Sequence, residues 1–240
     1  MELYAYLALV SVVTPQGLSA RRFLPLDDFV TDLAYLGQSA TYGCVLGCGH
    51  DVFECIPSVA KFARIRLDEG SSRHLCSSNS KREYRTLRDR IDRLRLLDPP
   101  KSVGDTRTPV ARLARDMYCG GLRIFLETAM CGAVVDDPST LRTIQHYVDE
   151  YMEKDDVVSA TEWGTIAVWP CMIAGSCVTR RDQQDEICRD LWHTPLWRMN
   201  QVLTAEKILK LLWASKDKRL FGPYGLYLVM EQYEVDMPMA

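Results

Sequence analysis

Hydrophobic residues recur every three to four positions along most of this chain, which is the period of one face of an α-helix. The clearest case lies in residues 81–97, where a continuous apolar stripe is bordered by Arg and Asp on the other faces. The stripe consists of Tyr84, Leu87, Ile91, Leu94 and Leu97. This pattern predicts a strongly amphipathic surface helix.

The same spacing predicts further helices and gives no convincing alternating strand. They are expected over residues 2–13, 27–36, 51–68, 109–130, 138–152, 161–175, 181–191, 196–213 and 224–233. Asp137 and Pro138 fit the N-cap and first position of the helix over 138–152. We therefore expect an all-α protein in which residues 1–240 form a single multi-helix bundle of roughly nine or ten helices.

Two segments depart from the amphipathic pattern. Residues 70–80 are rich in serine and polar throughout, so we expect a mobile loop there. The helix over 161–175 is apolar almost all round, which predicts that it is buried. The Gly120-Gly121 pair in the helix over 109–130 favours the close approach of a neighbouring helix.

The bulk composition is that of an ordinary globular protein. With 29 Lys and Arg against 32 Asp and Glu, the net charge is −3, which argues against direct binding of nucleic acid by this chain. Nine cysteines, an odd number in a chain of this size, indicate reduced thiols in a reducing compartment. No run of about 18 apolar residues predicts a membrane span, so we expect a soluble protein in the nucleus or cytoplasm.

The N-terminal segment is hydrophobic but lacks the basic start and cleavage site of a signal peptide. We interpret it as a core helix whose apolar face carries Leu3, Tyr6, Leu7 and Val10.

No motif assigns catalytic or metal-binding residues or a cofactor. Cys44, Cys48 and His50 are ligand types for zinc, but their spacing is unusual and no second pair completes four ligands. The four histidines lie apart from any nucleophile motif, and no phosphate loop or dinucleotide fingerprint is present. These observations favour a protein that is not an enzyme, although a shaped pocket can catalyse without a motif.

Six arginines in residues 81–97 raise the alternative of a nucleic-acid-binding helix. Acidic residues alternate with them, and Asp89 with Arg93 and Asp92 with Arg95 lie at helical pairing distances. We therefore favour a solvated, salt-bridged face.

Tryptophan and methionine gather in the C-terminal part of the chain, where core packing is the simplest explanation. Because Met and aromatic side chains also make adaptable linings, the alternative is a pocket for an apolar small molecule. Its candidate ligand-binding residues are Trp169, Met172, Ile173, Ser176, Met230 and Tyr233.

The segment from Trp169 to Cys177, followed by Arg180-Arg181-Asp182, resembles the signature of the fungal-specific transcription factor domain that follows a six-cysteine zinc cluster. Residues 121–126 and 202–213 resemble other helices of that family, and residues 1–66 are similar to its acriflavine-sensitivity-control-like branch. The zinc cluster itself, its basic linker and a coiled coil are missing from this sequence.

The resemblance implies a transcription-regulatory domain of a fungal regulator of secondary-metabolite or drug-response genes. In some branches of the family this helical domain resembles a receptor for a hydrophobic metabolite, so the resemblance also implies that the chain could sense such a ligand. Two alternatives remain: a biosynthetic enzyme that uses the helical scaffold for cyclisation or coupling, and an interaction module that forms homodimers or binds other regulators.

Overall fold

The computed structural model describes residues 2–11, 32–35, 46–70, 76–98, 108–159, 167–193 and 200–235. Within these ranges the secondary structure is helical and contains no strand, which confirms the predicted all-α class. None of the described helices is long and apolar enough to cross a membrane.

Most of the described helices coincide largely with predicted segments, although the segment 51–68 is divided into two helices and the one expected over 138–152 continues to Ser159. The bounds of the described helices are α1 Glu2–Val10, α4 His50–Phe53, α5 Cys55–Glu69, α6 Ser78–Leu96, α7 Thr108–Cys131, α8 Pro138–Ser159, α9 Val168–Gly175, α10 Arg181–His193, α11 Asn200–Ala214 and α12 Gly222–Gln232. Residues 12–13, 161–166 and 196–199 of expected helices lie outside the described residues. Most of the helix expected over 27–36 lies outside the described residues, and residues 34–35 form a short 3₁₀ turn. Residues 71–75 of the expected loop also lie outside them, whereas residues 78–80 belong to α6.

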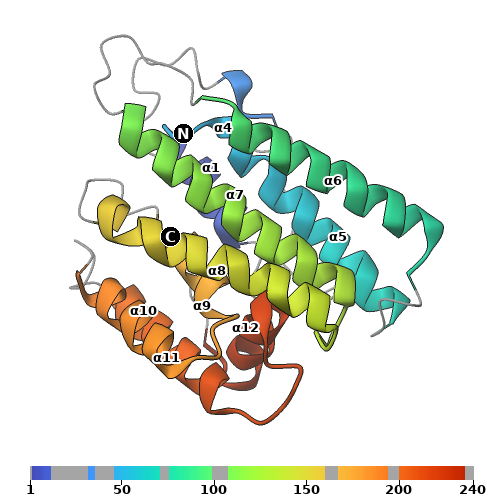
Figure 1. Ribbon diagram of the computed structural model, residues 1–240, viewed down its shortest axis with the longest axis vertical. Helices are drawn as coiled ribbons and strands as arrows, with labels where there is room; N and C mark the ends of the chain where they lie inside the picture. The colour runs from blue at the N-terminus through green and yellow to red at the C-terminus, as the bar shows by residue number, and fades with distance from the viewer. Residues whose placement is uncertain are drawn as a thin grey trace.

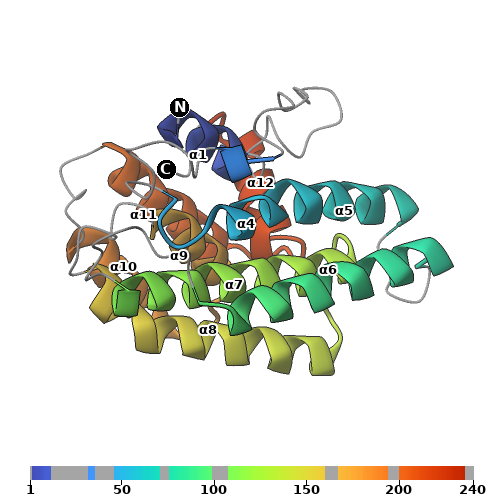
Figure 2. The ribbon, with the colours of Figure 1, turned by 90° about the horizontal axis from the view of Figure 1, so that it is seen from above.

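The four long helices α5 to α8 lie side by side, and each runs antiparallel to the next (Figure 1). Helix α7 lies at the centre, because it packs against α5, α6, α8, α9 and α12. Figure 2 shows α8 on one side of α7, with α5, α1 and α12 on the other. The core therefore forms around α7.

The amphipathic stripe of α6 faces this core. Tyr84, Leu87, Ile91 and Leu94 are buried as predicted, but Leu97 follows the helix end and is 56% exposed. The structure differs from the two ion pairs predicted within α6. Asp89 lies 3.5 Å from Arg88, and Arg93 donates to the backbone carbonyl of Asp89 at 3.1 Å, whereas the other two charges pair with residues on other helices. Asp92 lies 3.5 Å from the guanidinium of Arg123 on α7, and Arg95 pairs with Glu150 on α8 at 2.8 Å.

The face of α1 that packs on the core also differs from the prediction. Ala5, Tyr6, Leu9 and Val10 are buried, whereas Leu3 and Leu7 are exposed. The helix ELYAYLALV is apolar on every side, so its periodicity does not determine which face is covered.

A buried arginine on α7 joins three parts of the fold. The guanidinium of Arg115 donates to both carboxylate oxygens of Asp51 at 2.8 Å, to the carbonyl of Cys48 at 2.9 Å and to that of Leu94 at 2.8 Å. Burial raises the pKa of the Asp51 carboxyl, but the bonds and charge of Arg115 outweigh it and hold the pKa below its ordinary value. Gly49 has φ +116°, and a Cβ there would overlap the Arg115 guanidinium, so this approach requires glycine.

Candidate ligand-binding site around helix α9

Helix α9 lies at the centre of the C-terminal half of the core, as its composition predicts. All eight of its residues are buried, and it packs against α7, α8, α10, α11 and α12. Pro170 occupies the first turn, where a missing N–H costs nothing. A helix that is apolar on every face must be covered on every side, and this arrangement covers it.

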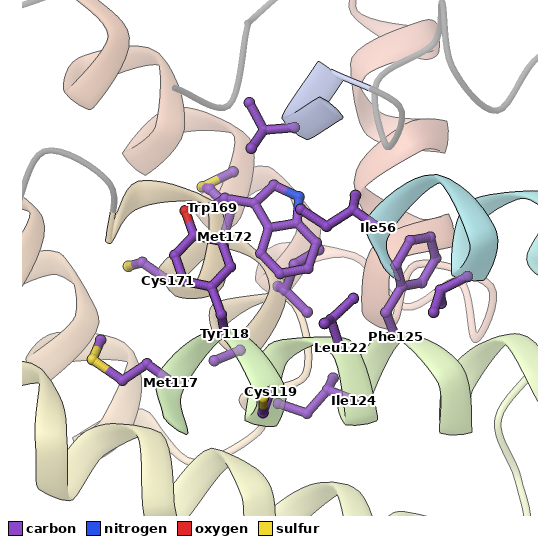
Figure 3. Close-up of a cluster of buried hydrophobic side chains, with 14 of the residues drawn as sticks. Ile56, Met117, Tyr118, Cys119, Leu122, Ile124, Phe125, Trp169, Cys171 and Met172 are labelled. Atoms are coloured by element: carbon purple, nitrogen blue, oxygen red, sulfur yellow. The ribbon is translucent and has the colours of Figure 1, made fainter. Parts of the chain in front are cut away.

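Trp169 is the largest buried side chain of α9 and lies on α7. Its rings stack on Tyr118 with centroids 5.5 Å apart and planes 1° from parallel. A Cβ on Gly121 would lie 3.1 Å from Cζ3 of Trp169, so the glycine provides room for the indole. Figure 3 shows the indole among Tyr118 and Leu122 of α7 and Ile56 of α5. The close approach predicted for the glycine pair is therefore made by Gly121.

The stacked pair continues into a row of buried aromatic rings. Phe53 lies 4.6 Å from Tyr118, and Tyr6 lies 5.8 Å from Phe53, between ring centroids. The hydroxyl of Tyr118 donates to that of Tyr6 at 3.4 Å. Burial raises the pKa of both phenols, so they are neutral at physiological pH. The row gives α9 an aromatic wall with two hydroxyl groups.

Trp169 is fully buried, yet its indole N–H has no hydrogen-bond partner among the residues that the structure describes. In Figure 3 the nitrogen lies on the side of the ring that faces Ile56. A buried donor without an acceptor costs about 1–3 kcal/mol, so buried polar groups in native proteins nearly always have a partner. This donor is the most unusual polar feature of the apolar core around α9.

Helices α11 and α12 hold the C-terminal end of α9 in place. The indole N–H of Trp213 donates to the carbonyl of Gly175 at 2.9 Å, and the backbone N–H of Gly222 donates to the carbonyl of Ser176 at 2.9 Å. The hydroxyl of Ser176 donates to the carbonyl of Ile173 at 2.6 Å. The proton of this hydroxyl is thus engaged, but its oxygen retains the capacity to accept.

The structure brings most of the predicted ligand-binding residues into one region. Trp169, Met172, Ile173, Ser176 and Met230 are all fully buried. Met230 comes from α12, which contacts α9. Tyr233 differs, because it follows the last turn of α12 and is 49% exposed.

Thiols near α9 are buried and unreactive. Burial raises the pKa of the Cys177 thiol to about 12 and that of Cys171 well above its ordinary value. Burial likewise raises the pKa of Cys48, one of the residues considered for zinc, while Cys44 lies outside the described residues. In the described ranges no three His, Cys, Asp or Glu side chains are grouped as a metal site requires.

Two features of the site are missed by reasoning from the sequence. Tyr6, Phe53 and Tyr118 come from three helices, and no local pattern shows that they meet at Trp169. The sequence also does not show that the Trp169 N–H lacks an acceptor among the described residues, because hydrogen bonding depends on the neighbours in the tertiary structure. Only the strongly apolar composition of α9 signals its central place.

Comparison with known proteins agrees with this all-helical arrangement. A family model described as the fungal specific transcription factor domain matches residues 1–234. No curated protein and no solved structure matches the chain. The match spans nearly all of the sequence, from α1 to the end of α12. The chain therefore belongs to the fungal-specific transcription factor domain family, which gives it a role in the regulation of transcription.

Proposed function

We propose that this chain is the ligand-sensing part of a fungal transcription regulator and that its ligand is an apolar molecule carrying a hydrogen-bond acceptor. The ligand binds beside α9, against Trp169, Met172, Ile173, Ser176 and Met230, with Tyr233 at the outer edge. The target genes in this proposal are those of secondary metabolism or drug response, and the protein acts in the nucleus.

The observation that carries the proposal is the buried indole N–H of Trp169, for which the described part of the chain offers no acceptor. A ligand carbonyl or ether oxygen would supply that acceptor and remove the cost of the unsatisfied donor. The surrounding atoms are almost wholly apolar, so the rest of the ligand must be apolar as well. A specific polar contact within an apolar lining is the usual arrangement of small-molecule sites.

Binding requires the core around α9 to change its packing, because these side chains are fully covered. Met172 and Met230 are the adaptable members, since methionine has three rotatable bonds and fits irregular spaces. A ligand that binds the opened packing more tightly than the closed one shifts the population toward the open form. Trp213 and Gly222 bond to the end of α9, so a shift of α9 reaches α11 and α12 directly.

A reporter experiment tests the proposal. The chain is fused to an unrelated sequence-specific DNA-binding module, and output from a promoter with the matching site is compared with output from the module alone. We expect the fusion to change reporter output and an apolar ketone, benzophenone, to alter it further. Equal output from the fusion and the bare module would contradict a regulatory role.

Occlusion variants test the ligand site. Met172→Trp and Met230→Trp should abolish the response to benzophenone while the far-ultraviolet circular dichroism stays helical, because the added ring occupies the space that opens. Leu203→Trp on the exposed face of α11 is the control and should respond as wild type does. Broad unfolding of both methionine variants would show a tightly packed core, and the ligand site would be ruled out.

A further inference from the structure

A cavity lies between α5 and α6, away from α9. Its volume is about 300 Å³, at the lower end of the range for small-molecule sites. Ser58, Lys61, Phe62 and Ile65 line it from α5. These residues follow helical spacing, so one face of α5 forms the wall. Phe62 is buried and Ile65 is 38% exposed, so apolar side chains form part of this wall.

The opposite wall belongs to the first turns of α6. Asn79, Ser80 and Glu83 line it there. The hydroxyl of Ser80 donates to Glu69 at 2.7 Å, and Glu69 also accepts from the hydroxyl of Ser77 at 2.6 Å. These bonds fix the end of α5 against the start of α6, so the width of the cavity is held by the fold.

The two walls carry opposite charges. Helices α5 and α6 run antiparallel (Figure 1), and Lys61 of α5 and Glu83 of α6 both line the cavity. No ion pair joins Lys61 to Glu83, and neither forms an ion pair elsewhere among the residues that the structure describes. The cavity thus presents an ammonium group, a carboxylate and the exposed apolar side chain of Ile65.

We infer that this cavity binds a small zwitterion with an apolar side group, of the chemical class of a hydrophobic α-amino acid. Its carboxylate pairs with Lys61, its ammonium group pairs with Glu83, and its side group covers Ile65. The volume admits a molecule of that size. This site is separate from the one proposed at α9, so either can fail without the other.

Isothermal titration calorimetry with L-phenylalanine tests the inference on the full chain. We expect saturable binding to wild type, and binding at least tenfold weaker for Lys61→Met and for Glu83→Gln. Lys81→Met, an exposed lysine of α6 outside the cavity, is the control and should bind as wild type does. The altered side chains are exposed, so the variants should keep the wild-type circular dichroism.

Two analogues separate the contributions of the charges. 2-Phenylethylamine lacks the carboxylate and 3-phenylpropanoate lacks the ammonium group, and each should bind at least tenfold more weakly than L-phenylalanine. Absence of saturable L-phenylalanine binding would overturn the inference. Equal affinity for the analogues, or for the Lys61 and Glu83 variants, would overturn it as well.

Discussion

Replacing Arg115 with methionine probes a buried charge that bonds to several parts of the fold. The side chain is 1% exposed, and it donates to Asp51, Cys48 and Leu94, so the substitution removes every bond that joins α4, α6 and α7 at this point. Methionine retains an unbranched stem of similar length, which limits the cavity that forms.

The magnitude follows from the groups left behind. The Cys48 carbonyl loses its donor at about 1–3 kcal/mol, whereas the Leu94 carbonyl retains the Leu97 N–H at 3.3 Å. The Asp51 carboxylate keeps the backbone N–H of Val52 but loses its guanidinium partner while still half-buried. Breaking a buried ion pair on one side costs about 3–5 kcal/mol, so we expect a destabilisation of about 4 kcal/mol.

Urea unfolding followed by circular dichroism measures this loss as a lower midpoint at an unchanged slope. Arg112→Met is the matched control on the same helix, because Arg112 is 61% exposed and pairs with the equally exposed Asp98. An exposed pair contributes about 0–1 kcal/mol, so the control should unfold almost as wild type does. A loss below about 1 kcal/mol for Arg115→Met would refute the reasoning.

Two further predictions concern packing and pH. Gly121→Ala should lower the free energy of unfolding by about 1–3 kcal/mol, because the added Cβ would lie 3.1 Å from Trp169. Gly120→Ala is the control: its added Cβ would have no neighbour within 4 Å, so the substitution should be neutral or stabilising. Hydrogen bonds, of which the one from the Ser77 hydroxyl has the largest effect, lower the pKa of Glu69 from 4.5 to about 2. The ionised Glu69 carboxylate therefore stabilises the folded state fully above pH 4.5, and this stabilisation is lost as the pH falls toward 2. The difference in stability between wild type and Glu69→Gln should therefore shrink over that interval, and a constant difference would contradict it.

The sequence predicts the helical class well because most helices bury one well-defined stripe. In α6 the stripe from Tyr84 to Leu94 determines the buried face, and Asp137 marks the start of α8 by accepting from the N–H of Thr140 at 2.9 Å. In α1 the same reasoning fails, because an apolar helix gives no contrast between faces.

Contacts across helices are beyond such reasoning. Spacing along α6 pairs Asp92 with Arg95, but both charges bond to residues on other helices, Arg123 and Glu150, which are nearer in the fold. The candidate site shows the same division. Composition indicates that α9 is buried. That the Trp169 N–H has no acceptor among the described residues depends on which side chains surround it in the fold, and the sequence does not show this.

Nuclear magnetic resonance of the tryptophan indole N–H groups tests the proposed ligand site most directly. The chain has five tryptophans, and the variant Trp169→Phe identifies the signal of Trp169 by its loss. Benzophenone has an acceptor carbonyl, and diphenylmethane has the same two rings without it. We predict that benzophenone shifts the Trp169 signal downfield in a saturable manner and that diphenylmethane does not. A Trp169 signal that stays unchanged with benzophenone would contradict the account.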